Sequence, residues 1–320
     1  MFFIIAIMIV VGGLTRLTDS GLSITEWQLF SGILPPLNND QWIMYFNLYK
    51  EIPEFKLQNY NMSIDEFKVI FWREWAHRFL GRLIGILFLI PLIYFTFKMK
   101  IKKLLSLYII FFLICFQGFI GWYMVSSGLD DRIDVSHFRL SVHLVIAFLI
   151  LSLILWNYFK ISESEKIINK LNPIIPFGFL VLIFIQIAIG AFVSGMDAGK
   201  IYNSWPFMGN TYFPDDNNLL NLFQLSAFSD PSLVQFIHRN LAYIIGIFYV
   251  LIFLKIYKNK MYELYKSINL LGLFIILQII LGIFTILYGA QIYIASMHQI
   301  SSIFLVSSCI YFLYINTEFN

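Results

Sequence analysis

Long apolar runs separated by short polar stretches dominate the chain. Each complete run is roughly 20 residues long, which is the length that a helix needs to cross a bilayer. The pattern predicts eight membrane-spanning helices, at about 2–15, 78–97, 104–125, 138–159, 174–194, 236–257, 267–288 and 291–314. The first would rise only ~20 Å, against a hydrocarbon core of ~30 Å. We therefore expect further residues upstream of the given start.

The composition agrees with this pattern. Of the 320 residues, 59% are hydrophobic and 13% are charged, and the mean hydropathy is +0.76. A soluble or nucleic-acid-binding domain does not carry so much apolar side chain, so we predict an all-α polytopic membrane protein. Cys115 and Cys309 both lie inside apolar runs and are expected to be buried thiols rather than a disulfide.

The charges of the loops predict an orientation. Lysines cluster after the second, fourth and sixth runs, and a loop rich in lysine stays on the inner side of the membrane. These lysines are Lys98, Lys100, Lys102, Lys103, Lys160, Lys166, Lys170, Lys255, Lys258, Lys260 and Lys266. Both termini are then inside, and the long segments 16–76 and 196–234 are outside.

The two halves of the chain match each other. Gly12–Trp27 aligns with Gly190–Trp205 without a gap. Further matches are His77 with His238, Arg78 with Arg239, Gln117 with Gln278, Gly121 with Gly282 and His143 with His298. Each half has four predicted spans, so the halves share one orientation and form a parallel repeat. We predict two four-helix bundles, an N-terminal half over 1–160 and a C-terminal half over 161–320.

Four of the five histidines obey one rule. Each lies near the outer, N-terminal end of an even-numbered span: His77, His143, His238 and His298. A single histidine in a membrane helix can be a hydrogen-bonded packing residue, but four at repeat-equivalent places favour metal ligation. Structural zinc takes four protein ligands and catalytic zinc three, whereas haem iron takes one or two axial ligands, which two facing helices supply. The pattern predicts one haem site in each half.

The arginines differ from the lysines in position. The basic residues of the predicted inner loops are all lysines, and every arginine lies at or near the outer side. Interfacial snorkelling is one explanation. A fixed anion is the other, because a guanidinium binds carboxylates in a bidentate fork, and haem carries two propionates. The candidates for propionate contacts are Arg16, Arg78, Arg139 and Arg239.

Glu74 breaks the symmetry of the halves. It precedes His77 by three residues and shares its helix face, while the equivalent place in the second half holds Gln235. One interpretation is a carboxylate near a helix N-terminus that pairs with Arg78. The other is a group that takes a proton or stabilises positive charge beside one haem only. In that case the first half performs the chemistry and the second holds a haem permanently.

Several stretches together resemble the haem A synthase family, over nearly the whole chain. They are GGLTRLTDSGLSITEW, the pair Pro35–Pro36, EFKVIFWREWAHRFLGR, RLSVHL, GAFVSGMDAGKIYNSWPFMG, QFIHRNLAY, LGIFTILYGA and SMHQ. The resemblance implies oxidation of a ring methyl of haem O to a formyl group, through a hydroxymethyl intermediate, to make haem A for cytochrome oxidase. It also implies that His77 and His143 frame the substrate haem O, that His238 and His298 ligate haem b, and that Glu74 is the essential glutamate.

Segment 16–76 contains no cysteine, so the chain is similar to the cysteine-free branch of this family found in mitochondria and alphaproteobacteria. The resemblance implies a bacterial cytoplasmic or mitochondrial inner membrane, with the haem sites toward the outer face. The farnesyltransferase that makes haem O is a candidate partner, while the electron acceptor and any homo-oligomer are not readable. The alternatives are a dihaem cytochrome b that only transfers electrons and a transporter or assembly factor. All four histidines lie at one side, which argues against a transmembrane electron wire.

Overall fold

The computed structural model describes the chain except for residues 28–30, 130–131, 162–169 and 318–320. The regular elements of the described part are all helices, apart from one isolated bridge between Met208 and Thr211. Its α-helices are α1 (Phe2–Leu17), α2 (Asn39–Lys50), α3 (Pro53–Leu57), α4 (Ile64–Lys98), α5 (Ile101–Ser126), α6 (His137–Ile161), α7 (Ile174–Gly195), α8 (Pro231–Lys258), α9 (Tyr262–Leu287) and α10 (Ile292–Thr317). Four short 3₁₀ helices are η1 (Ser31–Ile33), η2 (Ala198–Lys200), η3 (Leu219–Phe223) and η4 (Leu225–Ser229).

Seven of the helices found in the described residues are long and apolar enough to cross a membrane: α4 to α10. The prediction of an all-α polytopic membrane protein is therefore confirmed. The first predicted span corresponds to α1, an apolar helix of 16 residues. Helices suit this environment because each one satisfies its own backbone N–H and C=O groups, which lipid cannot do.

Helix α4 begins well before the span predicted at 78–97. Ser63 caps its first turn: the Ser63 hydroxyl accepts a hydrogen bond from the Glu66 N–H, and the Glu66 carboxylate accepts one from the Ser63 N–H. A hydropathy pattern overlooks this start because the first turns of α4 are polar. As a consequence, Glu74 and His77 lie on one continuous helix.

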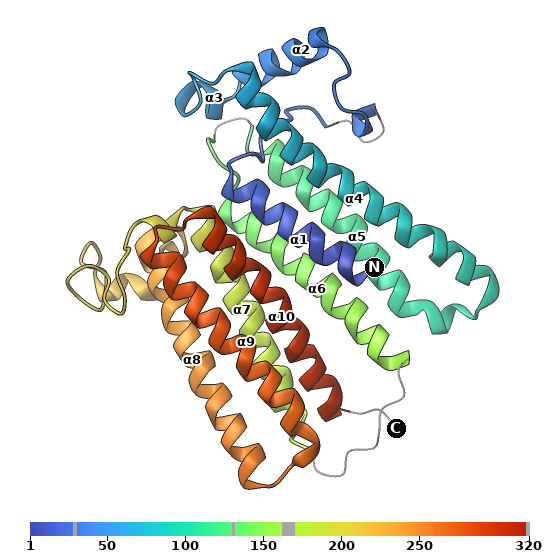
Figure 1. Cartoon of the computed structure of the whole chain (residues 1–320), viewed down its shortest axis with the longest axis vertical. Helices are drawn as coiled ribbons and strands as arrows, with labels where there is room; N and C mark the ends of the chain where they lie inside the picture. The colour runs from blue at the N-terminus through green and yellow to red at the C-terminus, as the bar shows by residue number, and fades with distance from the viewer. Residues whose placement is uncertain (28–30, 130–131, 162–169, 318–320) are drawn as a thin grey trace. The chain divides into compact units, whose positions relative to one another are not determined.

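The chain divides into two compact units, Met1–Ile150 and Leu151–Asn320, with the division inside α6. In the first unit, α4 packs against both α1 and α5 (Figure 1). The segment predicted as a long outer loop is not purely loop, because it contains α2 and α3. These helices cover the first turns of α4 through a buried apolar cluster: Leu22, Ile24, Phe46, Tyr49, Ile52, Phe67, Ile70 and Phe71.

The second unit contains a closed ring of four helices. Helix α7 packs on α8, α8 on α9, α9 on α10, and α10 returns to α7. Asn316, which is fully buried near the end of α10, accepts a hydrogen bond from the Leu171 N–H at 2.8 Å and donates one to the Leu171 carbonyl at 3.0 Å. This pair ties the end of α10 to the segment that precedes α7.

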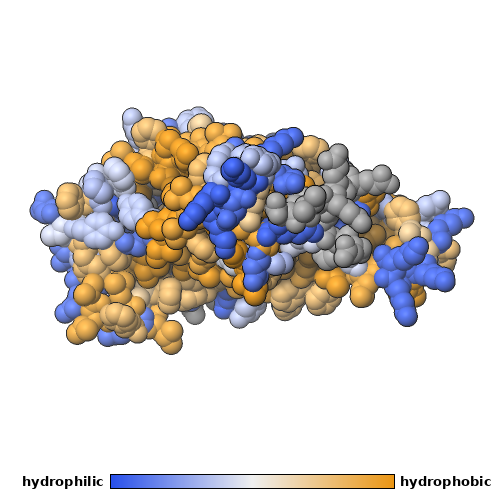
Figure 2. Space-filling view, turned by 90° about the horizontal axis from the view of Figure 1, so that it is seen from below, coloured by the Kyte–Doolittle hydropathy of each residue, from blue (hydrophilic) through white to orange (hydrophobic). Residues whose placement is uncertain are grey.

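Each unit has two chemically different ends. We call the end with the α4–α5 or α8–α9 turn the lysine end, because these turns hold Lys98, Lys100, Lys102, Lys103, Lys255, Lys258 and Lys260. The predicted inner residue Lys166 lies outside the described residues. Seen from below, relative to the view of Figure 1, hydrophilic patches stand among broad hydrophobic surfaces (Figure 2). The opposite end, with segments 18–63 and 196–230, is the loop end.

Candidate functional site

Each of the four histidines lies against a glycine of the preceding membrane helix. A Cβ built on Gly12, Gly121, Gly190 or Gly282 would stand 3.0–3.1 Å from the ring of His77, His143, His238 or His298, respectively. Such a distance is shorter than nine in ten real Cβ contacts, so a side chain at any of these glycines would require the histidine ring to shift. The four pairs join α1 to α4, α5 to α6, α7 to α8 and α9 to α10. All four histidines thus occupy cradles of one kind.

The structure brings the two predicted ligands of the first unit together. The ring centroids of His77 and His143 are 6.4 Å apart, and their planes are inclined by 70°. A metal ion between two imidazoles has metal–nitrogen bonds of ~2 Å on each side, so the ring centroids are roughly 6 Å apart. The observed spacing therefore fits one metal ion held between His77 and His143.

Three of the histidines have an available ring nitrogen. The Nδ1 atoms of His143, His238 and His298 are buried and have no hydrogen-bond partner among the described residues. A buried polar nitrogen without a partner is costly, and a bound ion is one way to satisfy such a nitrogen. Among the described residues, no group of three or more His, Cys, Asp or Glu side chains could hold a metal ion.

Two glutamines also contact the histidines of the second unit. The Gln186 amide nitrogen lies 3.3 Å from Nε2 of His238, and the Gln278 amide nitrogen lies 3.4 Å from Nε2 of His298. Gln278 was recognisable from its match with Gln117, whose amide donates to the His143 carbonyl at 2.9 Å. Gln186 has no counterpart in the alignment of the two halves, so sequence reasoning could not find it.

Glu74 is buried, with 2% of its surface exposed, and both of its oxygens accept hydrogen bonds. One oxygen accepts from Arg78 Nε at 2.9 Å and Nη2 at 2.6 Å. The other accepts from the Ser23 hydroxyl at 2.7 Å and the Ile24 N–H at 2.8 Å. The carboxylate therefore ties the segment after α1 to α4, and its charge is matched by Arg78.

The arginine next to the first histidine of each unit plays the same structural part. Arg78 donates to the carbonyls of Ile24 and Glu26, at 2.7 and 3.0 Å. Arg239 donates to the carbonyls of Tyr202 and Ser204, at 2.8 and 2.9 Å. Tyr202 and Ser204 are the repeat equivalents of Ile24 and Glu26. The arginines predicted to bind an anion thus also fix the segment that follows the preceding helix.

The two units differ at the position of Glu74, where the second unit has Gln235. Gln235 donates to the Tyr202 carbonyl at 3.2 Å, and its Oε1 is buried without a partner among the described residues. The second unit therefore keeps the arginine–carbonyl contacts without an acid. The asymmetry read from the sequence is present in the structure.

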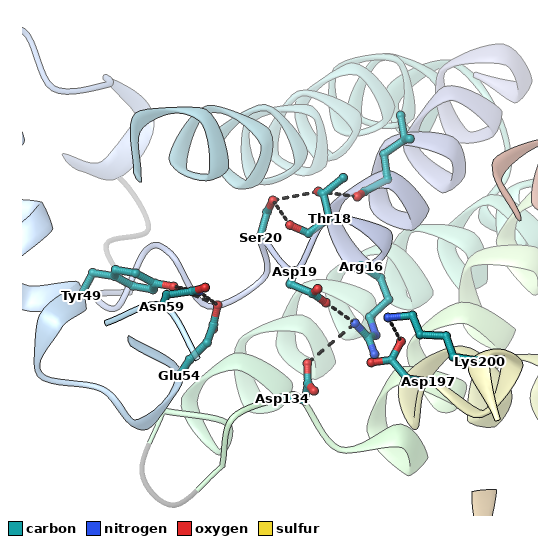
Figure 3. Close-up of polar contacts among 11 residues, drawn as sticks. Arg16, Thr18, Asp19, Ser20, Tyr49, Glu54, Asn59, Asp134, Asp197 and Lys200 are labelled. Atoms are coloured by element: carbon teal, nitrogen blue, oxygen red, sulfur yellow. Dashed lines mark hydrogen bonds and ion pairs between the residues drawn. The ribbon is translucent and has the colours of Figure 1, made fainter. Parts of the chain in front are cut away.

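The other two predicted arginines also have protein partners. Arg16 lies between Asp19 at 2.6 Å and Asp134 at 3.7 Å (Figure 3). Arg139 donates to the hydroxyls of Ser127 and Tyr123, and its guanidinium lies 4.3 Å from the centroid of the Tyr123 ring.

A small pocket opens at the loop end of the first unit. It is lined by Ile24, Glu26, Gly32, Leu34, Tyr45, Phe71, Trp75, Arg78 and Arg82. Arg82, one helical turn after Arg78, was not among the predicted site residues. Its i, i+4 spacing from Arg78 was the signal that could have identified it. Two guanidiniums in one pocket can bind a bidentate anion.

Comparisons with known proteins agree with this description. The family model described as cytochrome oxidase assembly protein matches residues 1–310. The chain is 50% identical over 320 residues to a protein named Heme A synthase from Pelagibacter ubique, covering 99% of this chain and 95% of the relative. Proteins of the same name from Rickettsia bellii and Flavobacterium johnsoniae are 43% and 40% identical, covering 95% and 96% of this chain and 92% and 93% of the relatives. From this near-complete match and the paired histidines in their glycine cradles, we conclude that the chain belongs to the cytochrome oxidase assembly protein family.

Proposed function

We propose that this protein is a haem A synthase, an oxidoreductase that converts a ring methyl of haem O to a formyl group. The observation that carries the proposal is the similarity, over nearly the full length of both chains, to proteins named Heme A synthase. The first oxidation gives a hydroxymethyl group, and the second gives a gem-diol that loses water to leave the aldehyde. Each oxidation adds the oxygen atom of one water molecule and releases two protons and two electrons, and the electrons pass to an acceptor that we do not assign.

The architecture that we propose is a parallel repeat of two four-helix bundles, with α1 as the eighth span. The N-terminal half, 1–160, binds substrate, and the C-terminal half, 161–320, binds haem b. The lysine end faces the inside of a bacterial cytoplasmic or mitochondrial inner membrane, in line with the positive-inside rule. The loop end, with both histidine pairs, then faces outward.

We assign His77 and His143 to the iron of the substrate haem O, because their 6.4 Å ring separation fits one metal ion between them. We assign His238 and His298 to haem b, because both have an unpartnered buried nitrogen and a glycine cradle. A haem b bound there would supply one-electron redox chemistry. Gln186 and Gln278 would orient the two rings.

The arginines at the loop end are candidates for propionate binding. Arg78 and Arg82 line one pocket, and Arg16, Arg139 and Arg239 lie at the same end of their units. Each of the four originally predicted arginines already has a protein partner, so a propionate would share its hydrogen-bond donors.

The role that we propose for Glu74 is electrostatic. Loss of electrons from the methyl group develops positive charge on the substrate, and a fixed negative charge in a low-dielectric site stabilises it. Both oxygens of Glu74 accept hydrogen bonds, which holds the carboxylate rigid. Glu74 can act in this way without taking up a proton.

The test is co-expression with an enzyme that makes haem O, in a host without haem A, followed by extraction and chromatography of the haems. We expect haem A or its hydroxymethyl precursor from the wild type. Haem b alone, with haem O unchanged in the presence of folded protein, would instead indicate an electron-transfer dihaem cytochrome b.

The variant that tests the carboxylate is Glu74→Gln. It keeps the size of the side chain, removes the charge and replaces one of the two acceptor oxygens by an N–H donor. We expect haem A formation to fall by about 10²-fold or more while the haem b spectrum, which reports the fold of the second unit, stays unchanged. The matched control is Gln235→Glu, which adds an acid at the equivalent place of the second unit and should leave product formation intact. Normal haem A formation by Glu74→Gln would refute the assignment.

A further inference from the structure

The segment between α7 and α8 carries an exposed apolar strip. Leu219, Leu220, Phe223 and Leu225 are 59%, 70%, 85% and 88% exposed. They lie on η3 and η4, and no residue from 217 to 229 is charged. A soluble surface scatters such side chains singly, whereas a contiguous apolar group indicates an interaction surface.

The strip is held in a fixed position rather than loosely attached. Ala227 of η4 is buried, and the Phe228 ring packs edge-on against Phe192 of α7, with 6.2 Å between the ring centroids. Immediately after η4, the Asp230 carboxylate accepts a hydrogen bond from the Leu233 N–H and caps α8. Asn217 donates to the same carboxylate from the other end of the segment. One side of the segment therefore faces the helices, and the apolar strip faces away from them.

These contacts also show which end of α7 and α8 holds the strip. Phe192 belongs to the last turn of α7, and Asp230 caps the first turn of α8, and both helices are long and apolar enough to span the membrane. The segment extends sideways from this end of the second unit (Figure 1). The strip is thus anchored at the loop end of two helices that can span the membrane.

Farther along α8, away from the strip, the exposed surface is apolar. On α8, Ile244, Ile247 and Leu251 are at least half exposed, as expected for a helix in contact with acyl chains. We propose that the strip inserts into the bilayer at the loop end, among the upper acyl chains beside α8. It would act as an interfacial anchor, as exposed Leu and Phe side chains do in other interfacial helices. The inference needs only that α7 and α8 span the membrane, and it is independent of the haem chemistry.

The experiment uses the full chain in phosphatidylcholine nanodiscs, with an environment-sensitive fluorophore on Phe223→Cys. Cys309 is fully buried, so only Cys115 has to be replaced by alanine. Phe223 is so exposed that its replacement should leave the fold intact, and Leu225→Cys repeats the measurement independently. The control is Asn210→Cys, at an exposed polar residue of the same inter-helix segment.

We expect blue-shifted emission from labels at 223 and 225, and stronger quenching by a nitroxide on the upper acyl chain than by aqueous iodide. A label at 210 should instead be quenched more strongly by aqueous iodide than by the nitroxide. Strong quenching by iodide at 223 and 225 would overturn the proposal, because it places the strip in water. Protection from both quenchers would also overturn it, because another protein surface, such as a second copy of the chain, would then cover the strip.

Discussion

Glu54 of α3 is a buried acid, and its protonation should make the stability of the protein depend on pH. Its side chain is 3% exposed. The Tyr49 hydroxyl donates to the Glu54 carboxyl at 2.9 Å, and the Asn59 amide donates at 3.3 Å (Figure 3). No cation pairs with Glu54 among the described residues.

Burial raises the pKa of Glu54 to about 8, from an ordinary value of 4.5. The hydrogen bond from Tyr49 acts in the opposite direction. Further negative charges raise the pKa as well: Glu74, Asp134 and Asp19. At neutral pH the folded protein therefore holds a proton on Glu54.

The perturbation is Glu54→Gln, which is neutral at every pH and can still accept the hydrogen bond from Tyr49. Between pH 4.5 and about 8, the folded wild type carries a proton on Glu54 that the unfolded chain has lost. In this window the free energy of unfolding of the wild type falls as the pH rises, by about 1.4 kcal/mol per pH unit. From pH 5.5 to 7.5 the variant should therefore gain about 3 kcal/mol relative to the wild type.

The assay is thermal unfolding of the purified proteins in one detergent, at several pH values across this window. The difference in Tm between Glu54→Gln and wild type should grow by several degrees as the pH rises. The control is Glu51→Gln, whose side chain is 80% exposed and should leave the pH profile unchanged. If the Tm of wild type and of Glu54→Gln depends on pH in the same way, the folded protein holds no proton on Glu54 in this window, and the raised pKa is refuted.

Two further substitutions test contacts in the second unit. Gly190→Ala would place a Cβ 3.0 Å from the His238 ring, so we expect the haem absorbance of the purified protein to be reduced or shifted. Gly178→Ala, on the same helix with no atom within 4 Å of its Cβ, should leave the spectrum unchanged, and indistinguishable spectra of the two variants would contradict the cradle. Asn316→Ala should lower the free energy of unfolding by ~2–4 kcal/mol, because both buried backbone groups of Leu171 lose their partner. An unchanged Tm would show that the described pair contributes nothing.

The sequence predicted the membrane helices well, because hydropathy over roughly 20 residues reflects a strong solvent preference. It also placed His77 and His143 on two different helices, and their ring centroids lie 6.4 Å apart. The start of α4 at Ile64 was missed, since a capping box in a polar stretch leaves no trace in hydropathy. The helices α2 and α3 within segment 16–76 were missed for a related reason: short amphipathic helices are stabilised mainly by tertiary packing.

The polar partners were the least predictable part. The anion contacts predicted for the arginines stay a prediction. The carbonyl groups that Arg78 and Arg239 bind belong to the backbone and have no side-chain signature. The burial of Glu54 was equally hidden, because EIPEFK reads as an exposed polar segment. The glycine cradles left a visible signal in the matched pair Gly12 and Gly190, although a match alone does not say what a glycine touches.

These cradles have a mechanical consequence for the register of the helices. In lipid, apolar side chains give helices little reason to prefer one vertical alignment over another, and close contacts at small residues set it instead. If α7 slid along α8 by one helical turn, a distance of ~5.4 Å, the His238 ring would meet the side chain of Gln186 or Ser194, which share the helix face of Gly190. Each imidazole therefore packs at one position on the preceding membrane helix. The four contacts oppose axial sliding within each of the four helix pairs.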